Sequence, residues 1–126
     1  RSLIRNNDIK LTACDQKRDF IFCNDVVSLY SFCINNINQF DSKTYNVGNG
    51  SSISLKDFII EAHNLTNSKS RLLFNALQHR ENEIMDSYAN LNDLETIGWL
   101  PKFSLKQALQ ETIKFEFNRE SKNELC

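Results

Sequence analysis

Residue types that serve redox chemistry on nucleotides occur in this sequence, but not at the spacings that the chemistry needs. Its glycines are Gly48, Gly50 and Gly98, so no glycine-rich loop that presents backbone amides to a pyrophosphate can be drawn. A Tyr-x-x-x-Lys pair, in which the lysine lowers the tyrosine pKa, is also absent. Neither a P-loop lysine motif nor a G-x-S-x-G elbow occurs. From its own residues we therefore expect no catalytic residue in the chain.

The spacing of cysteines and histidines argues against a metal site. The cysteines at 14, 23, 33 and 126 form no C-x-x-C pair and lie far in sequence from His63 and His79. Zinc ligands cluster more tightly than this. We predict no metal ligand, and we interpret the cysteines as reduced structural thiols of a cytoplasmic protein, where disulfides are rare.

Composition narrows the class of protein. The chain has 126 residues, 40% of them hydrophobic, and a net charge of −1, which suits one small domain with a core. Near-neutral charge argues against a nucleic-acid partner or an anionic membrane surface. No apolar run approaches the roughly 18 residues of a membrane span. Because no methionine opens the chain, we expect that its natural beginning is missing.

The first half predicts alternating strands and helices. The apolar run 19–23 suggests a buried strand, after which Asn24 and Asp25 can cap a helix over 26–37. Apolar residues nearly encircle that helix, so it needs cover on most sides. Residues 43–47 suggest a second strand that ends in a glycine turn. An α/β fold is the class that this order favours.

The second half contains clearer signals for helix ends. Ser54 is placed to cap a helix with Asp57 three positions later. A short strand is expected over 71–74 and loop or extended chain over 86–89. Asn92 can cap a short helix that Gly98 ends in a left-handed conformation. Ser104 and Gln107 form another capping box, which opens the final helix.

Several segments together resemble the carboxy-terminal part of the NAD-dependent epimerase/dehydratase family, the extended short-chain dehydrogenases that act on nucleotide sugars. In chain order they are residues 16–27 (QKRDFIFCNDVV), 45–48 (YNVG), 54–55 (SL), 80–84 (RENEI), 87–89 (SYA), 97–102 (IGWLPK) and 104–113 (SLKQALQETI). The resemblance covers nearly the whole chain.

The resemblance implies a fold and a division of the chain. Residues 1–118 would be the carboxy-terminal substrate-binding portion and 119–126 a polar tail. The Rossmann nucleotide-binding core, which carries the glycine loop and the catalytic tyrosine in this family, would be missing. The helix 26–37 would then lie against that missing domain, which explains its apolar circumference.

Four residues match positions that hold substrate in this family. Arg18 and Arg80 match arginines that bind the nucleotide diphosphate, since a guanidinium forks onto phosphate oxygens. Glu83 matches a carboxylate that accepts hydrogen bonds from ribose hydroxyls, and Asn46 matches the asparagine of Tyr-Asn-x-Gly. The sequence departs from the family at Asn82, where a glycine is usual. A surface role for the arginines and a turn-forming role for Asn46 are the alternatives.

The resemblance implies an NAD(P)-dependent nucleotide-sugar epimerase, dehydratase or reductase in deoxysugar or surface polysaccharide biosynthesis. The chain would supply its nucleotide-sugar site and be inactive alone, with NAD or NADP bound elsewhere in the intact protein, a cytoplasmic homodimer. No nucleic acid or membrane partner is expected. The alternative is a non-catalytic interaction module that self-associates through the exposed apolar helix.

Overall fold

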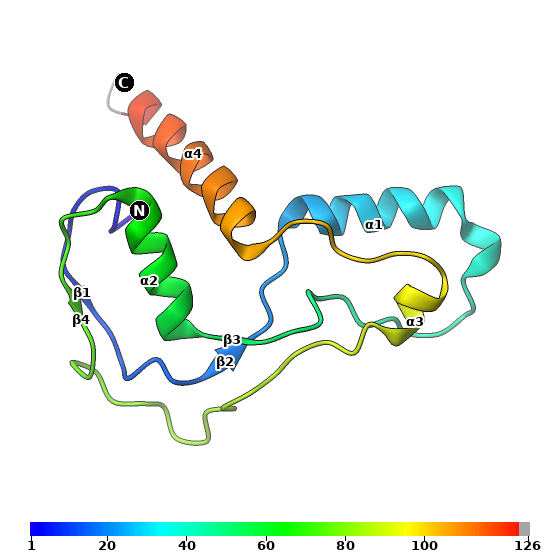
Figure 1. The fold of residues 1–126 in the computed structure, drawn as a ribbon, viewed down its shortest axis with the longest axis horizontal. Helices are drawn as coiled ribbons and strands as arrows, with labels where there is room; N and C mark the ends of the chain where they lie inside the picture. The colour runs from blue at the N-terminus through cyan, green and yellow to red at the C-terminus, as the bar shows by residue number, and fades with distance from the viewer. Residues whose placement is uncertain (124–126) are drawn as a thin grey trace.

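The computed structural model describes residues 1–123 and shows a small, elongated α/β structure (Figure 1). Helices α2 and α4 lie with paired β1 and β4 at one end, and α1 and α3 lie at the other (Figure 1). The elements are β1 (Ile9–Lys10), β2 (Lys17–Arg18), α1 (Cys23–Asn35), the 3₁₀ turn η1 (Ile37–Gln39), β3 (Ile53–Ser54), α2 (Leu55–Thr66), β4 (Leu72–Leu73), α3 (Asn92–Thr96) and α4 (Leu105–Asn123).

Two short strand pairs replace the predicted longer strands. β1 runs parallel to β4, so the strand expected over 71–74 is confirmed in its central residues, while β2 pairs antiparallel with β3. The expected strand over 19–23 is wrong. Its aromatic residues pack separately: Phe20 stacks on Phe58 at 4.1 Å between ring centroids, and Phe22 meets Phe103 at 4.8 Å. A short apolar run signals burial, and here burial comes without a sheet.

The strand expected over 43–47 is also wrong. No backbone–backbone hydrogen bond joins residues 44–47 to another part of the described chain, and a strand exists only where a neighbour pairs with it. Side chains hold this segment instead. Tyr45 packs edge-on against Phe40 at 5.2 Å, and the ammonium of Lys43 lies 2.8 Å from Asp93 Oδ1.

Helix α1 begins earlier than predicted. Phe22 occupies the N-cap position, without a side-chain cap, and the helix runs from Cys23 to Asn35. Asp25 therefore does not cap it. Its carboxylate is 2% exposed and accepts hydrogen bonds from the amides of Lys102 and Phe103 at 2.9 and 3.2 Å. Because a buried carboxylate needs hydrogen-bond donors, these two amides join Asp25 at the start of α1 to the segment before α4.

One face of α1 is uncovered in this structure. Leu29 is buried in a core cluster with Leu91, Leu94 and Trp99, and the indole of Trp99 donates to Ser28 Oγ at 3.2 Å. On the other side, the exposed apolar residues of α1 and η1 are Val27, Tyr30, Ile34 and Ile37. The prediction that this helix is apolar on more sides than the chain can bury is therefore confirmed.

The predicted cap of α2 is confirmed. Ser54 Oγ accepts a hydrogen bond from the amide of Asp57 at 3.0 Å and donates to Asp57 Oδ2 at 2.7 Å. The helix ends at Asn67, which adopts a left-handed φ of 49°. This conformation is one that asparagine tolerates better than most residues. The buried Ala62 of α2 lies on a helix that packs against α4.

The carboxy-terminal helices confirm most of the local predictions. Gly98 has a φ of +90° after α3, and the amide of Ser104 donates to Gln107 Oε1 at 3.0 Å before α4. Asn92 is not the cap of α3; Leu91 holds that position, and Asn90 Oδ1 accepts from the amide of Asn92 at 2.9 Å.

Helix α4 continues through Asn123, past residue 119 where a polar tail was expected, and residues 124–126 lie outside the described part. Ion pairs from Arg1 to Glu116 at 2.9 Å and from Arg5 to Glu120 at 2.7 Å join this end of α4 to the amino-terminal segment. None of the described helices is both long and apolar enough to cross a membrane.

Candidate functional site

Arg18, the last residue of β2, points its guanidinium toward the long segment between β4 and α3. Its Nη2 lies 2.5 Å from Glu83 Oε1, and its Nη1 donates to the carbonyl of Lys17 at 2.7 Å. The Arg18 side chain is 30% exposed and that of Glu83 is 21% exposed. The ion pair is therefore half-buried, and part of the Arg18 side chain remains open to solvent.

Arg18 and Arg80 line the same hollow, which has a volume of about 320 Å³. We call it the first hollow; its lining residues are Arg18, Arg80, Glu81, Asn82, Glu83, Ile84 and Ser87. Among residues 1–123, no carboxylate lies within ion-pair distance of Arg80. The hollow therefore holds one guanidinium paired with a carboxylate and another available for an anion.

Asn82 gives the turn before Glu83 the conformation that a glycine would. It has a positive φ of 59°, in the left-handed region that glycine and, less readily, asparagine adopt. Asparagine therefore tolerates the left-handed backbone of this turn, from which Glu83 pairs with Arg18.

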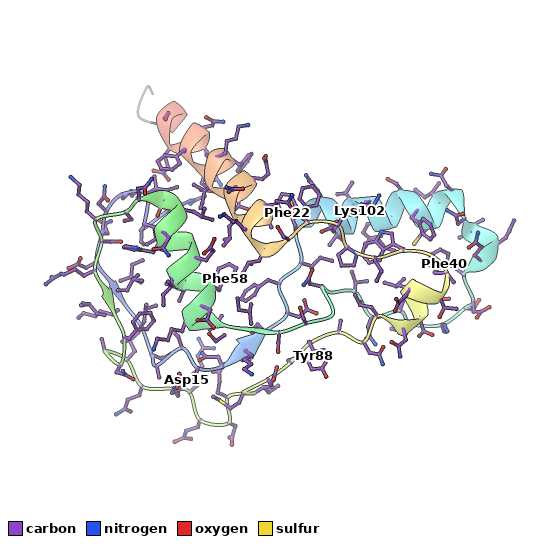
Figure 2. The ribbon with its side chains drawn as sticks, viewed as in Figure 1. Asp15, Phe22, Phe40, Phe58, Tyr88 and Lys102 are labelled. Atoms are coloured by element: carbon purple, nitrogen blue, oxygen red, sulfur yellow. The ribbon has the colours of Figure 1, made fainter. Side chains whose placement is uncertain are left out.

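Asn46 lines a second hollow, of about 350 Å³, which adjoins the first because both include Arg18 and Ser87. The residues of the second hollow are Arg18, Asp19, Ile21, Asn46, Val47, Gly48, Ser87, Tyr88 and Ala89. The structure therefore brings all four predicted residues to one surface. Figure 2 shows Tyr88, which lines the second hollow, on the segment between β4 and α3.

Asp19, which no motif of the sequence indicated, joins the parts of this surface. Asp19 follows Arg18 directly but does not pair with it. Its Oδ1 accepts from the amide of Asn49 at 2.6 Å, and its Oδ2 accepts from the amides of Gly50 and Ala89 at 3.0 and 3.1 Å. An aspartate after an arginine carries no local signal of these distant partners.

A larger open hollow of about 660 Å³ lies beyond Tyr88 and Ala89, which it shares with the second hollow. Its polar side chains are those of Tyr88, Glu95 and asparagines 49, 90 and 92, and neither arginine nor lysine lines it. A diphosphate needs cationic donors, so the first and second hollows suit an anion better. Within the described residues, no group of three histidine, cysteine or acidic side chains could hold a metal ion.

Comparison with curated proteins identifies the relatives of this chain, although no family model matches it. A CDP-abequose synthase of Salmonella typhimurium is 41% identical over 109 residues, which are 84% of this chain and 36% of that protein. A CDP-abequose synthase of Salmonella muenchen is 34% identical over 119 residues, covering 92% of this chain and 40% of that protein. The resemblance to nucleotide-sugar enzymes is confirmed. The chain spans 36–40% of the length of these relatives.

Solved structures of the epimerase/dehydratase type share the fold. A UDP-glucose 4-epimerase with UDP-glucose from Thermotoga maritima superimposes with a TM-score of 0.83 at 18% identity, over 94% of this chain and 37% of that one. A GDP-mannoheptose C4 reductase from Campylobacter jejuni with NADP bound gives a TM-score of 0.72 at 21% identity, over 87% and 35% of the two chains. A dTDP-glucose 4,6-dehydratase from Bacillus anthracis in complex with NAD gives 0.75 at 17% identity, over 94% and 38%. At these identities the likeness concerns the fold, so the chain is an α/β piece covering about a third of such structures.

Proposed function

We propose that this chain is the carboxy-terminal, substrate-binding portion of an NAD(P)-dependent nucleotide-sugar epimerase, dehydratase or reductase. The observation that carries the proposal is that Arg18 and Arg80, far apart in sequence, line one hollow together with Glu83. Two guanidinium groups and one carboxylate at one surface match the chemistry of a nucleoside diphosphate, whose phosphates need donors and whose ribose hydroxyls need an acceptor.

Each site residue has a role in this proposal. Arg80, which pairs with no carboxylate in the described chain, binds phosphate oxygens directly. Arg18, in the same hollow, also binds them while it remains paired with Glu83. Glu83 has a second oxygen to accept from a ribose hydroxyl. Asn46 offers both a donor and an acceptor from the second hollow.

The name of the Salmonella relatives makes CDP the first nucleotide to test. When bound in the intact protein, NAD(P)H would supply the hydride, with a proton from a donor group, that reduces the C4 carbonyl of a keto sugar in a reductase. In an epimerase, the oxidised cofactor would accept a hydride from C4 and return it. Deoxysugar formation for surface polysaccharide, in the cytoplasm, is the setting we propose. The chain alone turns over nothing, because it lacks the glycine loop and the Tyr-x-x-x-Lys pair.

The proposed partner of α1 is the dinucleotide-binding domain, which would carry the NAD or NADP. Tyr30 and Ile34 on α1 are 69% and 76% exposed, and the nearby extended residues 44–47 have backbone groups without a backbone partner in the described chain. A sheet of that domain could cover the side chains of α1 with an apolar face and pair with the backbone of residues 44–47. Homodimerisation of the intact protein remains part of the proposal.

A second candidate function rests on the same exposed face. Without a covering domain, α1 would make the chain an interaction module that associates with itself through Val27, Tyr30 and Ile34, since apolar patches of this kind mark association surfaces. In that case, Arg18 and Arg80 would be ordinary surface cations.

Titration of the isotope-labelled chain with CDP, and with cytidine as a control without phosphates, separates the two functions. We expect CDP to shift the signals of Arg18, Arg80 and Glu83 and cytidine to leave them nearly unchanged. UDP and dTDP in parallel titrations report which base is preferred. Absence of any shift at these residues would favour the interaction module, and turnover by the chain with added NAD would contradict the proposal.

A further inference from the structure

Three consecutive residues, Lys17, Arg18 and Asp19, hold residues 78–90 of the segment between β4 and α3. This stretch forms no helix or strand. Besides the packing of Ala89 against the core, two hydrogen bonds and one ion pair from residues 17–19 join it to the rest of the described chain. The amide of Lys17 donates to the carbonyl of Met85 at 2.7 Å, Arg18 pairs with Glu83, and Asp19 accepts from the amide of Ala89. Both Arg80 and Glu83 belong to this segment, so its position decides the shape of the first hollow.

Asp19 also holds the loop that carries Asn46 and lines the second hollow. Its carboxylate accepts from the amides of Asn49 and Gly50, which directly follow the wall residues 46–48 of the second hollow. One half-buried carboxylate thereby joins β2, the loop after residue 46 and the segment that contains Ala89. Hydrogen bonds from backbone amides to a carboxylate are charge-assisted and therefore stronger than neutral ones.

Gly48 leaves room for the contact between the Asp19 carboxylate and Ala89. We call Asp19, Gly48 and Ala89, with the amides that Asp19 binds, the Asp19 junction. A Cβ atom at Gly48 would lie 2.6 Å from Ala89 Cβ and closer still to Asp19 Oδ2. Neither neighbour could remain where it is, because real Cβ contacts are not this short. The glycine at position 48 is consequently needed for space, and the Asp19 carboxylate and Ala89 occupy that space.

We propose that Asp19 is a positioning residue for the nucleotide-diphosphate site: it holds the walls that carry Asn46, Arg80 and Glu83 at the separation at which they bind one ligand with Arg18. The proposal rests on the proposed function of these four residues and adds one that touches no ligand. A fixed site loses less conformational entropy when it binds than a mobile one, so the contribution of Asp19 is preorganisation.

The direction in which the affinity for CDP changes when the Asp19 charge is removed distinguishes a positioning role from an electrostatic one. Asp19 is a negative charge beside Arg18, and removing it would strengthen anion binding if charge alone mattered. Positioning predicts weaker binding. Asp19→Asn removes the charge while keeping the shape, and it leaves one oxygen and one NH₂ group where two oxygens accepted three amides. Gly48→Ala disturbs the same junction with no change in charge.

The test measures the affinity of the 126-residue chain for CDP by calorimetry in wild type, Asp19→Asn and Gly48→Ala. Asp15→Asn is the matched control, because the substitution makes the same change in charge. Asp15 is exposed, lies before β2 (Figure 2) and lines neither hollow. We expect CDP affinity to fall about tenfold in both junction variants and to stay within about twofold in the control. Equal or tighter binding of CDP by Asp19→Asn would overturn the positioning role.

Ligand-free spectra separate this proposal from the function on which it rests. In Asp19→Asn, we expect faster amide exchange at Asn49, Gly50 and Ala89 and shifted signals of Arg18 and Ser87. The indole signal of Trp99, which reports on the core, should stay in place. If the wild-type chain fails to bind CDP, the proposed function fails, and the spectra of the ligand-free chain alone decide whether Asp19 positions the site. Unchanged signals of Arg18 and Ser87 then contradict the positioning role, and shifted ones support it.

Discussion

Arg18 and Glu83, 65 positions apart in the sequence, form an ion pair in which Nη2 and Oε1 are 2.5 Å apart. The pair joins the end of β2 to a segment without regular secondary structure, and it lies in the hollow that Arg80 also lines. An anion entering this hollow would meet one free guanidinium and one that already has a carboxylate partner. Ligand binding therefore depends on how Arg18 is shared between Glu83 and the ligand.

Glu83→Gln should change the preference of the site between pyrophosphate and CDP. Without the carboxylate, Arg18 is released and a negative charge is lost, so we expect pyrophosphate to bind about threefold more tightly. CDP should gain less or lose affinity, because the ribose hydroxyls lose their acceptor. Calorimetry with both ligands gives the ratio. Glu81→Gln, in the same hollow but outside any ion pair of the described chain, is the control, and an equal effect there would contradict the assignment.

Arg80→Gln should weaken CDP binding by about tenfold, because a charge-assisted contact to phosphate is lost. Arg80 is exposed and pairs with no carboxylate in the described chain, so its replacement should leave the unfolding temperature unchanged. Lys106→Gln, on the exposed surface of α4, matches the change in charge. If both variants bind CDP equally, Arg80 acts only through net charge.

Polar substitutions on the exposed face of α1 should reduce self-association of the chain. Tyr30→Ser and Ile34→Ser replace side chains that are 69% and 76% exposed, so little packing is lost. Sedimentation velocity should show a shift from dimers or larger species toward the monomer. A wild-type chain that is already monomeric at high concentration would refute the prediction.

A substitution on the buried side of α1, in contrast, should destabilise the fold. Leu29→Ala removes a side chain from the core, and we expect it to lower the free energy of unfolding by about 2–4 kcal/mol. Urea denaturation measures this loss. A change below about 0.5 kcal/mol would place Leu29 outside the cooperative core, in disagreement with its burial.

Acid should weaken the ion pair between Asp8 and Arg71, which lie directly before the paired strands β1 and β4. Hydrogen bonds from the Arg71 side chain and then from its backbone amide hold the pKa of Asp8 below its usual value of 3.8. A carboxyl whose pKa is lower when folded stabilises the fold fully above its unfolded pKa, and that contribution is lost as pH falls through the folded value. The loss should therefore begin near pH 4 and continue below it.

Asp8→Asn should make the free energy of unfolding less dependent on pH in this acidic range. Because Asp8 is exposed, the difference from wild type will be small and reduced further by salt. Urea denaturation at pH 6 and at pH 3 provides the comparison, with Asp15→Asn as a control that has no arginine partner in the described chain. A wild type and an Asp8→Asn variant with parallel pH profiles would exclude this contribution.

The helix ends were predictable because their determinants are local. The bonds between Ser54 and Asp57 and between Ser104 and Gln107 span three residues, and the left-handed Gly98 follows from the properties of glycine itself. The strands over 19–23 and 43–47 were predicted wrongly, because residues that favour a strand do not specify the neighbouring strand that must pair with them. Phe20 stacks on Phe58 of α2, and residues 44–47 pair with no strand in the described chain.

The four candidate residues of the site, Arg18, Asn46, Arg80 and Glu83, could be identified from motifs shared with nucleotide-sugar enzymes. Their place on one surface, the pairing of Arg18 with Glu83 and the contacts of Asp19 became known only from the folded chain. Asp19 meets amides 30, 31 and 70 positions away. Contacts at such separations depend on where the whole chain brings its loops, which no local pattern of residue types encodes.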